Sequence, residues 1–236
     1  MFDICATRSP DGGLSSLGNG TEMMASPEDS RIDPKEIARR MKFDYSRGVK
    51  DQPTRILEGI SDLCRKLENQ DCTLNSFMHE VADLISKQLG IASVAIAVKD
   101  RYDGKYRYPI VTGVEESIVE GFKNIAYTKE QLFDDSTFAS HEISRQTRIY
   151  LAEEHPYANG EEFSYRRPQL IGMKRRSLND SLEADYIDIF IFGPNNEVLG
   201  WIETSGTRLM KLPDIQTIRW MELLANLLGF AIRTLQ

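Results

Sequence analysis

The C-terminal part of the chain has the clearest pattern of apolar and polar positions. Two apolar runs, Tyr186–Phe192 and Val198–Thr204, flank a Gly-Pro-Asn-Asn turn at 193–196, which predicts a β-hairpin. After Pro213, apolar residues recur every three or four positions, which is typical of one face of an amphipathic helix. These residues are Ile215, Ile218, Met221, Leu224, Leu228, Ile232 and Leu235. We therefore expect a sheet hairpin followed by a long terminal helix.

Two further helical patterns come earlier in the chain. Thr54 can cap the first, whose apolar positions at 56, 60, 63 and 67 share one face with Cys64. A cysteine on such a face is more often a buried small hydrophobe than a reactive thiol. The second pattern begins at Thr73, and Gly90 is suited to stop that helix in the left-handed conformation.

The run 91–99 is almost entirely apolar and predicts a buried strand. Alternation places Val94, Ile96 and Val98 on one face and two alanines on the other, where small side chains would let a helix approach closely. An Asp-Gly pair at 103–104 predicts a hairpin to a strand over Tyr106–Thr112. Pro109 inside that strand implies an edge position or a bulge.

The middle of the chain is less regular. Residues 115–135 have apolar residues at helical spacing, and Gly121 predicts that this helix is short or bent. A short strand is expected at 147–151. The polar stretch 152–181 is long for a loop in a compact domain, and such loops are often functional, for example as a lid over a binding site.

This order of elements predicts an α+β domain with an antiparallel sheet. We expect the first and last helices side by side on one sheet face, and the middle helix and the 152–181 stretch on the other, with a pocket between. The domain is predicted over 53–236. Residues 1–52 are interpreted as a flexible tail or linker with a short helix near 34–43, capped by Asp33.

Composition narrows the class of protein. The net charge of -7 argues against nonspecific nucleic-acid binding, because a phosphate backbone would be repelled overall. No apolar run approaches the roughly 20 residues that span a bilayer, so we expect no membrane partner. The N-terminus lacks a secretory pattern, and Cys5, Cys64 and Cys72 form no CxxC spacing, which together favour a reduced, cytoplasmic setting.

Several stretches together resemble the GAF domain family over about residues 54–235. TLNSFMHEVADLISKQLGIASVAIAVKD is similar to the family's opening, ISRQTRIYLAEEHPYA to its middle strand, DYIDIFIFGPNNEVLGWIETSG to its last hairpin and PDIQTIRWMELLANLLGFAIR to its closing helix. The resemblance implies a sensory or regulatory module that binds a small molecule or mediates dimerisation. It also implies a six-stranded sheet, of which the residue pattern predicts five strands. The NKFDE set of cyclic-nucleotide-binding members is not discernible, and the Cys-His pair of bilin-binding members is absent.

Polar residues inside apolar strands are the candidates for a pocket, because a buried polar group needs a partner. Asp188 stands between two isoleucines, and Trp201 and Glu203 point to one face. The hypothesis is that a ligand with an amine or a ring stacks on Trp201 and pairs with an acid. The further candidates nearby are Tyr127, Arg148 and Tyr150. The alternative is a solvent-exposed edge or an internal pair such as Asp188 with Arg148.

Other polar clusters carry weaker hypotheses. A basic run, Tyr165-Arg166-Arg167-Pro168 with Lys174-Arg175-Arg176, could dock phosphate or nucleic acid, although basic loops are commonly only solvated. Glu153-Glu154-His155 and Asp134-Asp135 offer donors for a metal, and His141 and His155 are possible haem ligands, but sequence neighbours alone rarely converge on a metal. We therefore predict no metal site and no catalytic residues, and the cofactor stays unknown.

Three functional interpretations remain open. The first is a non-enzymatic sensor that binds an unidentified small molecule and signals through helix packing. The second is a ligand-free dimerisation module, because Trp220, Leu223 and Leu227 lie off the core stripe of the last helix and favour a homodimer in either case. The third is a GAF-type free methionine sulfoxide reductase, which needs cysteines in its pocket. No kinase, cyclase or DNA-binding segment follows the last helix. If the chain is full length, we expect its output to pass to a separate signalling protein, and if it is a fragment, the tail at 1–50 is interpreted as the remnant of an upstream domain.

Overall fold

The structure, a computed structural model, describes residues 34–47, 51–134, 136, 138–154, 175–182 and 184–235. The chain divides into two units, residues 1–49 and residues 50–236. The first unit contains helix α1 (Pro34–Arg47), whose described side chains are all exposed. The helix continues past the predicted end at Phe43, and the predicted cap Asp33 lies outside the described residues.

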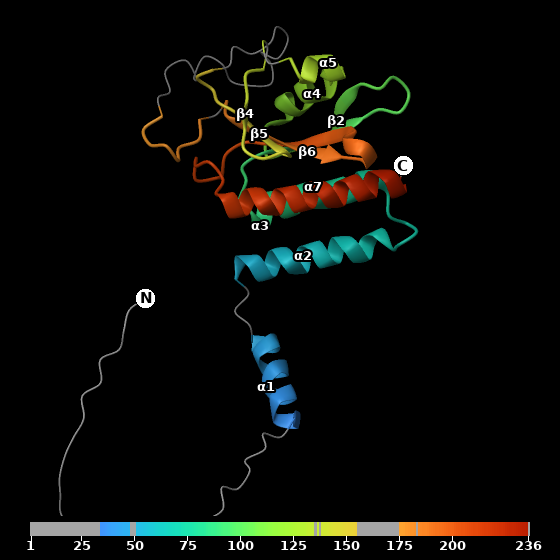
Figure 1. Cartoon of the computed structure of the whole chain (residues 1–236), viewed down its shortest axis with the longest axis vertical. Coiled ribbons are helices and arrows are strands. Elements are labelled where there is room, and N and C mark those ends of the chain that lie inside the picture. Colours follow the sequence, from blue (N-terminus) through green and yellow to red (C-terminus); the bar gives the residue numbers. More distant parts are fainter. Residues whose placement is uncertain are drawn as a thin grey trace, which may run out of the picture. The chain divides into compact units, whose positions relative to one another are not determined.

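The second unit is built on one antiparallel sheet with the strand order β3-β2-β1-β7-β6-β5-β4 (Figure 1). The strands are β1 (Val94–Lys99), β2 (Tyr106–Thr112), β3 (Ala126–Tyr127), β4 (His141–Glu142), β5 (Thr147–Tyr150), β6 (Tyr186–Phe192) and β7 (Val198–Thr204). All five predicted strands are present, which confirms the α+β class. The sheet has seven strands and not five or six, because β3 and β4 add two residues each, too few for a sequence pattern.

Both predicted hairpin turns form as their residues require. Gly104 has a φ of +72° in the turn between β1 and β2, a conformation that favours glycine. The β1–β2 register shifts between Ile96 and Val98, opposite Pro109, so the predicted bulge is confirmed. In the turn between β6 and β7, Asn195 and Asn196 adopt φ values of 60° and 62°, which asparagine tolerates better than most residues.

Helices α3 (Leu74–Gln88) and α7 (Ile215–Leu235) cover one face of the sheet, and α2 (Gln52–Leu67) packs on α3 beyond them (Figure 1). The prediction that the first and last helices of the domain pair on the sheet is therefore wrong in one respect, since α3 takes the place of α2. The physical reason is that α2 buries only Ile56 and Leu63. Its apolar face is wide enough to pack on α3 but not to cover the sheet as well. Cys64 lies on the exposed side of α2, against the expectation of burial.

Helix ends and close contacts explain these positions. Asp51, and not Thr54, caps α2, because its Oδ1 accepts a hydrogen bond from the Thr54 backbone N–H at 2.9 Å.

Glycine lets two pairs of elements approach closely. A Cβ at Gly229 of α7 would lie 2.8 Å from the Phe192 carbonyl oxygen, and one at Gly59 of α2 would collide with Leu84 of α3.

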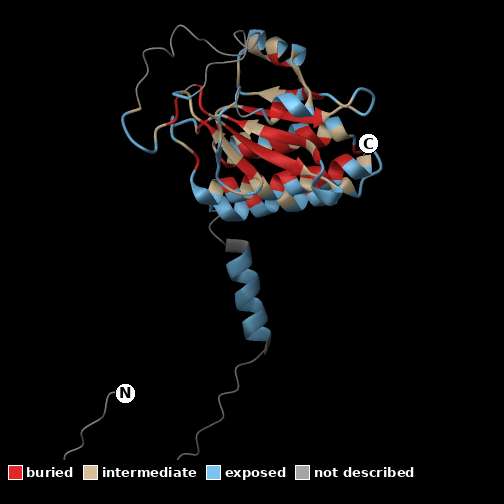
Figure 2. Ribbon diagram, turned by 45° about the horizontal axis from the view of Figure 1, so that its top comes forward, coloured by how far each residue is buried: buried red, intermediate tan, exposed pale blue. Residues whose placement is uncertain are grey.

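The opposite face of the sheet carries α4 (Glu116–Asn124) and α5 (Lys129–Leu132). The predicted helix over 115–135 is interrupted, because Ile125 is extended and leads into β3, after which a Thr128–Gln131 capping box starts α5. Ala95 and Ala97 face this side, but the space above them is filled by aromatic side chains and not by a helix approaching closely. Figure 2 shows the strands as the most buried layer of the unit.

Candidate functional site

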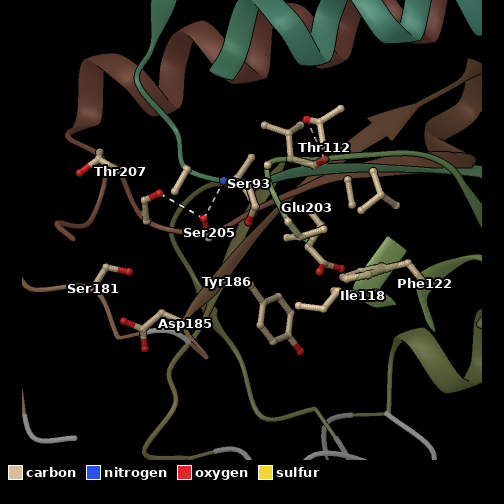
Figure 3. A pocket seen from close by; sticks show the side chains of 18 of the residues that line it. Ser93, Thr112, Ile118, Phe122, Ser181, Asp185, Tyr186, Glu203, Ser205 and Thr207 are labelled. Carbon is tan, nitrogen blue, oxygen red and sulfur yellow. Dashed lines mark hydrogen bonds between the residues drawn. The ribbon is translucent and has the colours of Figure 1, made fainter. Parts of the chain in front are cut away.

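A cavity of about 570 Å³ lies at one end of the sheet, on the side of α4 (Figure 3). Its walls come from the start of β1, the ends of β2 and β7, the first turns of α4 and the segment that leads into β6. This volume is within the range of about 300–1,000 Å³ that is typical of small-molecule sites. The polar side chains in the wall include Ser93, Thr112, Tyr186, Glu203, Ser205 and Thr207.

A hydrogen bond between the residue before β1 and the residue after β7 lies in one wall of the cavity. Ser205, just after β7, accepts a hydrogen bond at its Oγ from the Ser93 backbone N–H at 3.0 Å (Figure 3). The same hydroxyl donates to the Gly206 carbonyl oxygen at 3.2 Å. The strand ends are therefore tied together where they border the cavity.

The charged side chains in the described wall are all acidic. Glu115, Asp185 and Glu203 contribute carboxylates, and the described lining contains no lysine, arginine or histidine. Glu115 is exposed at the start of α4, Asp185 is buried, and Glu203 is half-buried on β7.

A hydrogen-bond chain holds Glu203 in place. The Tyr108 hydroxyl donates to Glu203 Oε2 at 2.6 Å and accepts from Trp201 Nε1 at 3.3 Å. Burial, and then the charge of Glu203, raise the pKa of Tyr108 well above its usual range. The phenol therefore keeps its proton and serves as a fixed donor to the carboxylate.

Asp188 is a second acid on the same face of the sheet. It lies directly opposite Glu203 on one side and Arg148 on the other in the strand register, and it is buried. Its Oδ1 has no hydrogen-bond partner among the described residues. Burial first, and the Glu203 charge second, raise the pKa of Asp188 well above its usual range, whereas the hydrogen bond from Tyr150 and the charge of Arg148 act in the opposite direction.

The structure brings the six predicted ligand residues to the face away from α3 and α7, but it gives them different roles. Glu203 is in the cavity wall. Trp201 is only 1% exposed and packs among tyrosines, with its ring centroid 5.7 Å from that of Tyr108 and 6.2 Å from that of Tyr127. Trp201 is therefore a support beneath the site and not an open stacking surface.

The other two candidates lie on β5. The Tyr150 ring stacks on Tyr186, with centroids 4.3 Å apart, and Tyr186 reaches the cavity. The Arg148 guanidinium carbon lies 5.4 Å from the centre of the Phe133 ring and 5.7 Å from that of Phe190. For the alternative of an internal Asp188–Arg148 pair, the structure places the two residues opposite each other in the strand register, and the charge of Arg148 acts to lower the pKa of Asp188.

Sequence reasoning missed Tyr108 and Asp185. Tyr108 follows the alternation of β2, but its contact with Glu203 spans two strand pairings and leaves no local signal. Asp185 precedes β6 in an irregular segment. Its carboxylate accepts from the backbone N–H groups of Ala152 at 2.9 Å and Leu182 at 2.7 Å.

Arg175 completes an ion cluster behind the cavity. Its Nη2 lies 2.8 Å from Asp185 Oδ1 and 2.9 Å from Glu153 Oε2. Arg175 belongs to the basic run for which both docking and simple solvation are possible from the sequence, and its guanidinium instead pairs with Glu153 and Asp185. Arg176 is exposed, and the rest of that run, 165–168 and Lys174, lies outside the described residues.

None of the described metal, haem and cysteine candidates lines the cavity. His141 Nε2 lies 2.6 Å from Glu154 Oε2 in an exposed pair, and His155 and Asp135 lie outside the described residues. Within the described ranges, no group of three potential ligands could hold a metal ion. Cys72 is buried in the core on the α3 side and Cys64 is exposed on α2, while Cys5 is outside the described residues.

The arrangement of the elements matches solved GAF domains. No family model matches the chain, and no curated protein matches it. The chain is similar in structure to the A. aeolicus nlh2 GAF domain in an inactive state, with 16% identity and a TM-score of 0.50, over 79% of this chain and 100% of that one. It is also similar to the GAF domain/HD domain protein from Geobacter sulfurreducens, with 11% identity and a TM-score of 0.50, over 70% of this chain and 95% of that one. The chain therefore has a GAF fold.

None of the described helices combines the length and the apolar character needed to cross a bilayer.

Proposed function

We propose that this chain is a non-enzymatic sensory or regulatory domain that binds a small molecule in the cavity at the end of the sheet. The observation that carries the proposal is the cavity itself, because its volume of about 570 Å³ and its mixed wall of apolar side chains and convergent polar groups suit a small ligand. The GAF fold supports it, and the similar A. aeolicus nlh2 GAF domain is described in an inactive state.

Neighbouring residues of one strand connect the cavity to the helices on the other face of the sheet. On β7, Glu203 is in the cavity wall, while its neighbour Ile202 belongs to the core beneath α7. A ligand that shifts β7 therefore changes the packing of α7, which is the differential contact that a two-state module requires. The readout passes to a separate signalling protein through this helical layer.

The test is a thermal-shift screen of a small-molecule library on the whole chain and on Ile118→Trp. Ile118 points into the cavity from α4, so a larger side chain there fills the space (Figure 3). We expect compounds that raise the melting temperature of the natural chain, because a ligand that binds only the folded state stabilises it by mass action. The shift is expected to vanish in the Trp variant. A library that gives no shift abolished by this variant would contradict the proposal.

A second candidate function is homodimerisation through α7. Trp220 and Leu227 are partly buried against the core, but Leu223 is 43% exposed and Phe230, at the same helical spacing, is 50% exposed. Exposed apolar residues in a row on a helix favour a partner surface, here a second copy of the chain. Light scattering after size-exclusion chromatography tests it: Leu223→Glu with Phe230→Glu converts a dimer to a monomer, whereas a natural chain that is already monomeric contradicts it.

The reductase interpretation receives no support from the positions of the described cysteines. The core that contains Cys72 lies on the helical side of the sheet, and the cavity lies on the other side. We expect Cys64→Ser and Cys72→Ser to leave any turnover of free methionine sulfoxide unchanged, and a loss of turnover would reverse this conclusion.

A further inference from the structure

We infer that α7 and the β4–β5 hairpin form a polar latch, and that this latch couples the cavity to the helical face of the sheet. The latch consists of Glu222 and Asn226 on α7 and of Ser144, Gln146 and Thr147 on the hairpin. The inference rests on the proposed function, because it names how the occupancy of the same cavity is read out by α7.

The contacts of the latch lie on one side of α7. The Thr147 hydroxyl donates to Glu222 Oε1 at 2.7 Å, and the Ser144 hydroxyl donates to the same oxygen. One helical turn further along, Asn226 Oδ1 accepts a hydrogen bond from Gln146 Nε2 at 3.1 Å. Residues four positions apart share a face of a helix, so α7 holds the hairpin at two points. Hydrogen bonds to a carboxylate are stronger than those between neutral groups, which makes Glu222 the main point.

The hairpin lies at an edge of the sheet (Figure 1). β5 pairs with β6 on one side and with the two-residue strand β4 on the other, and both residues of β4 are exposed. Edge elements with exposed side chains open at a lower free-energy cost than central strands. The latch therefore holds a part of the sheet whose position changes more readily than that of β1 or β7.

Strand β5 connects the latch with the cavity. Alternation places Thr147 on the helical face and Tyr150 on the opposite face, about 10 Å along the strand. The Tyr150 ring stacks on that of Tyr186, with centroids 4.3 Å apart, and Tyr186 lines the cavity (Figure 3). A ligand that displaces the Tyr186 ring therefore displaces Tyr150 and the strand that carries Thr147. This connection is separate from the contact of Ile202 on β7 with the core beneath α7.

The energy of the latch suits a switch. Thr147 is buried, whereas Glu222 is half-buried and keeps access to water. The carboxylate can therefore exchange its hydroxyl partners for water, and the net contribution of one such hydrogen bond is about tenfold in an equilibrium constant. This factor lies within the range of about 5–150-fold that is typical of coupling between two sites in a protein.

The experiment measures native-state hydrogen exchange of the whole chain and requires no identified ligand. Tyr186→Leu removes the ring at the cavity end of the connection. Glu222→Met removes the acceptor of both hydroxyls and keeps the length of the side chain. Arg219→Met is the matched control, because Arg219 is an exposed charged residue on the same helix, three positions from Glu222. Each α7 variant is studied with and without Tyr186→Leu.

We expect Tyr186→Leu to speed amide exchange about tenfold in the hairpin and in α7 around Glu222. With Glu222→Met, the effect on the hairpin should persist while that on α7 falls below about twofold, and Arg219→Met should leave both effects unchanged. If the effect on α7 is equal with and without Glu222, or absent throughout, the inference fails while the proposed function stands. If the thermal-shift screen finds no ligand that Ile118→Trp blocks, the proposed function fails and the inference with it.

The reverse direction provides a second measurement, since coupling between two sites is reciprocal. Thr147→Val removes one hydroxyl of the latch and keeps the shape of the side chain. We expect it to shift the NMR signals of the Tyr186 ring, whereas those of Tyr106, a buried ring on β2, should stay in place. An unchanged Tyr186 ring, or an equal shift of both rings, overturns the inference even if Tyr186→Leu does not fold.

Discussion

The two faces of the sheet differ in composition although the same strands build both. The face under α3 and α7 packs predominantly aliphatic side chains, such as Ile96, Ile189 and Ile202. The other face packs aromatic rings and carries Asp188 and Glu203. A period of two along each strand separates these roles, so each strand stabilises the fold with one set of residues and forms the candidate site with the other. Substitutions on the two faces should therefore have different consequences.

The largest expected effect tests the ion cluster on the cavity side. Arg175→Ala leaves the buried Asp185 carboxylate without its cation, and we expect the free energy of unfolding to fall by about 3–5 kcal/mol. Urea denaturation measures the change. The neighbouring Arg176→Ala is the control, because Arg176 is exposed, and it should stay within about 0.5 kcal/mol of the natural chain. Equal effects of the two substitutions would show that the cluster contributes little.

The next effect tests the helical side. Leu224 of α7 is fully buried, and Leu224→Ala removes its methyl groups from the core, so the free energy of unfolding should fall by about 2–5 kcal/mol. The adjacent Leu223→Ala should cost less than about 0.5 kcal/mol in a monomer, because Leu223 is largely exposed. Denaturant titrations of both variants provide the measurement. A large loss for Leu223→Ala would indicate that this side chain is covered by a second copy.

A smaller effect is expected for Tyr108, which packs in the aromatic layer of the cavity side and also holds Glu203 in place. Tyr108→Phe removes the hydroxyl that donates to Glu203 and should cost about 1.5–3 kcal/mol of unfolding free energy, as for hydrogen bonds to charged groups. Urea denaturation measures the change. Tyr102→Phe is the control, since Tyr102 is fully exposed, and an unchanged stability of Tyr108→Phe would contradict the role assigned to this hydrogen bond.

The smallest expected effect is a dependence on pH. The pKa of Asp188 is raised in the folded state, so its contribution to stability is present below the pKa of about 3.9 in the unfolded chain and is lost as pH rises toward the folded value. Asp188→Asn, which resembles the protonated acid, should therefore gain stability relative to the natural chain as pH rises from about 4 to about 8. Thermal unfolding at several pH values measures this.

Asp214 gives the opposite sign and serves as the control for that experiment. The hydrogen bonds from Thr217 lower the pKa of Asp214, so its contribution to stability is present above the unfolded pKa and is lost as pH falls. Asp214→Asn should lose stability relative to the natural chain as pH rises through the acid range. Parallel pH profiles for the two variants would refute the assignment for Asp188.

Much of the fold could be predicted because its signals are local. The alternation in Val94–Lys99 and Tyr186–Phe192 and the turn residues at 104 and 195 each act within a few positions. The position of α2 could not be predicted, because an apolar stripe shows that a helix packs but not on which element it packs. The strands β3 and β4 are two residues long and carry no period.

The candidate site, like the fold, could be predicted only in part. Asp188 and Glu203 were found because a charged residue in an apolar strand is visible in the sequence. Their relation to Tyr108 and the shape of the cavity depend on strand order, which joins β2, β1, β7 and β6 from distant parts of the chain. The pairing of Arg175 with Asp185 was hidden because both residues lie in irregular segments with no pattern to connect them.

The cluster around Arg175 has a consequence for protein engineering. Asp185 receives the Ala152 N–H from the chain leaving β5 and the Leu182 N–H from the chain returning to β6, and Arg175 links it to Glu153. The chain just after β5 and the chain just before β6 are thus fastened to each other by side chains in addition to the backbone ladder between the two strands. A redesign of this domain should therefore keep Arg175 and Asp185 together, because changing either one releases both segments at once.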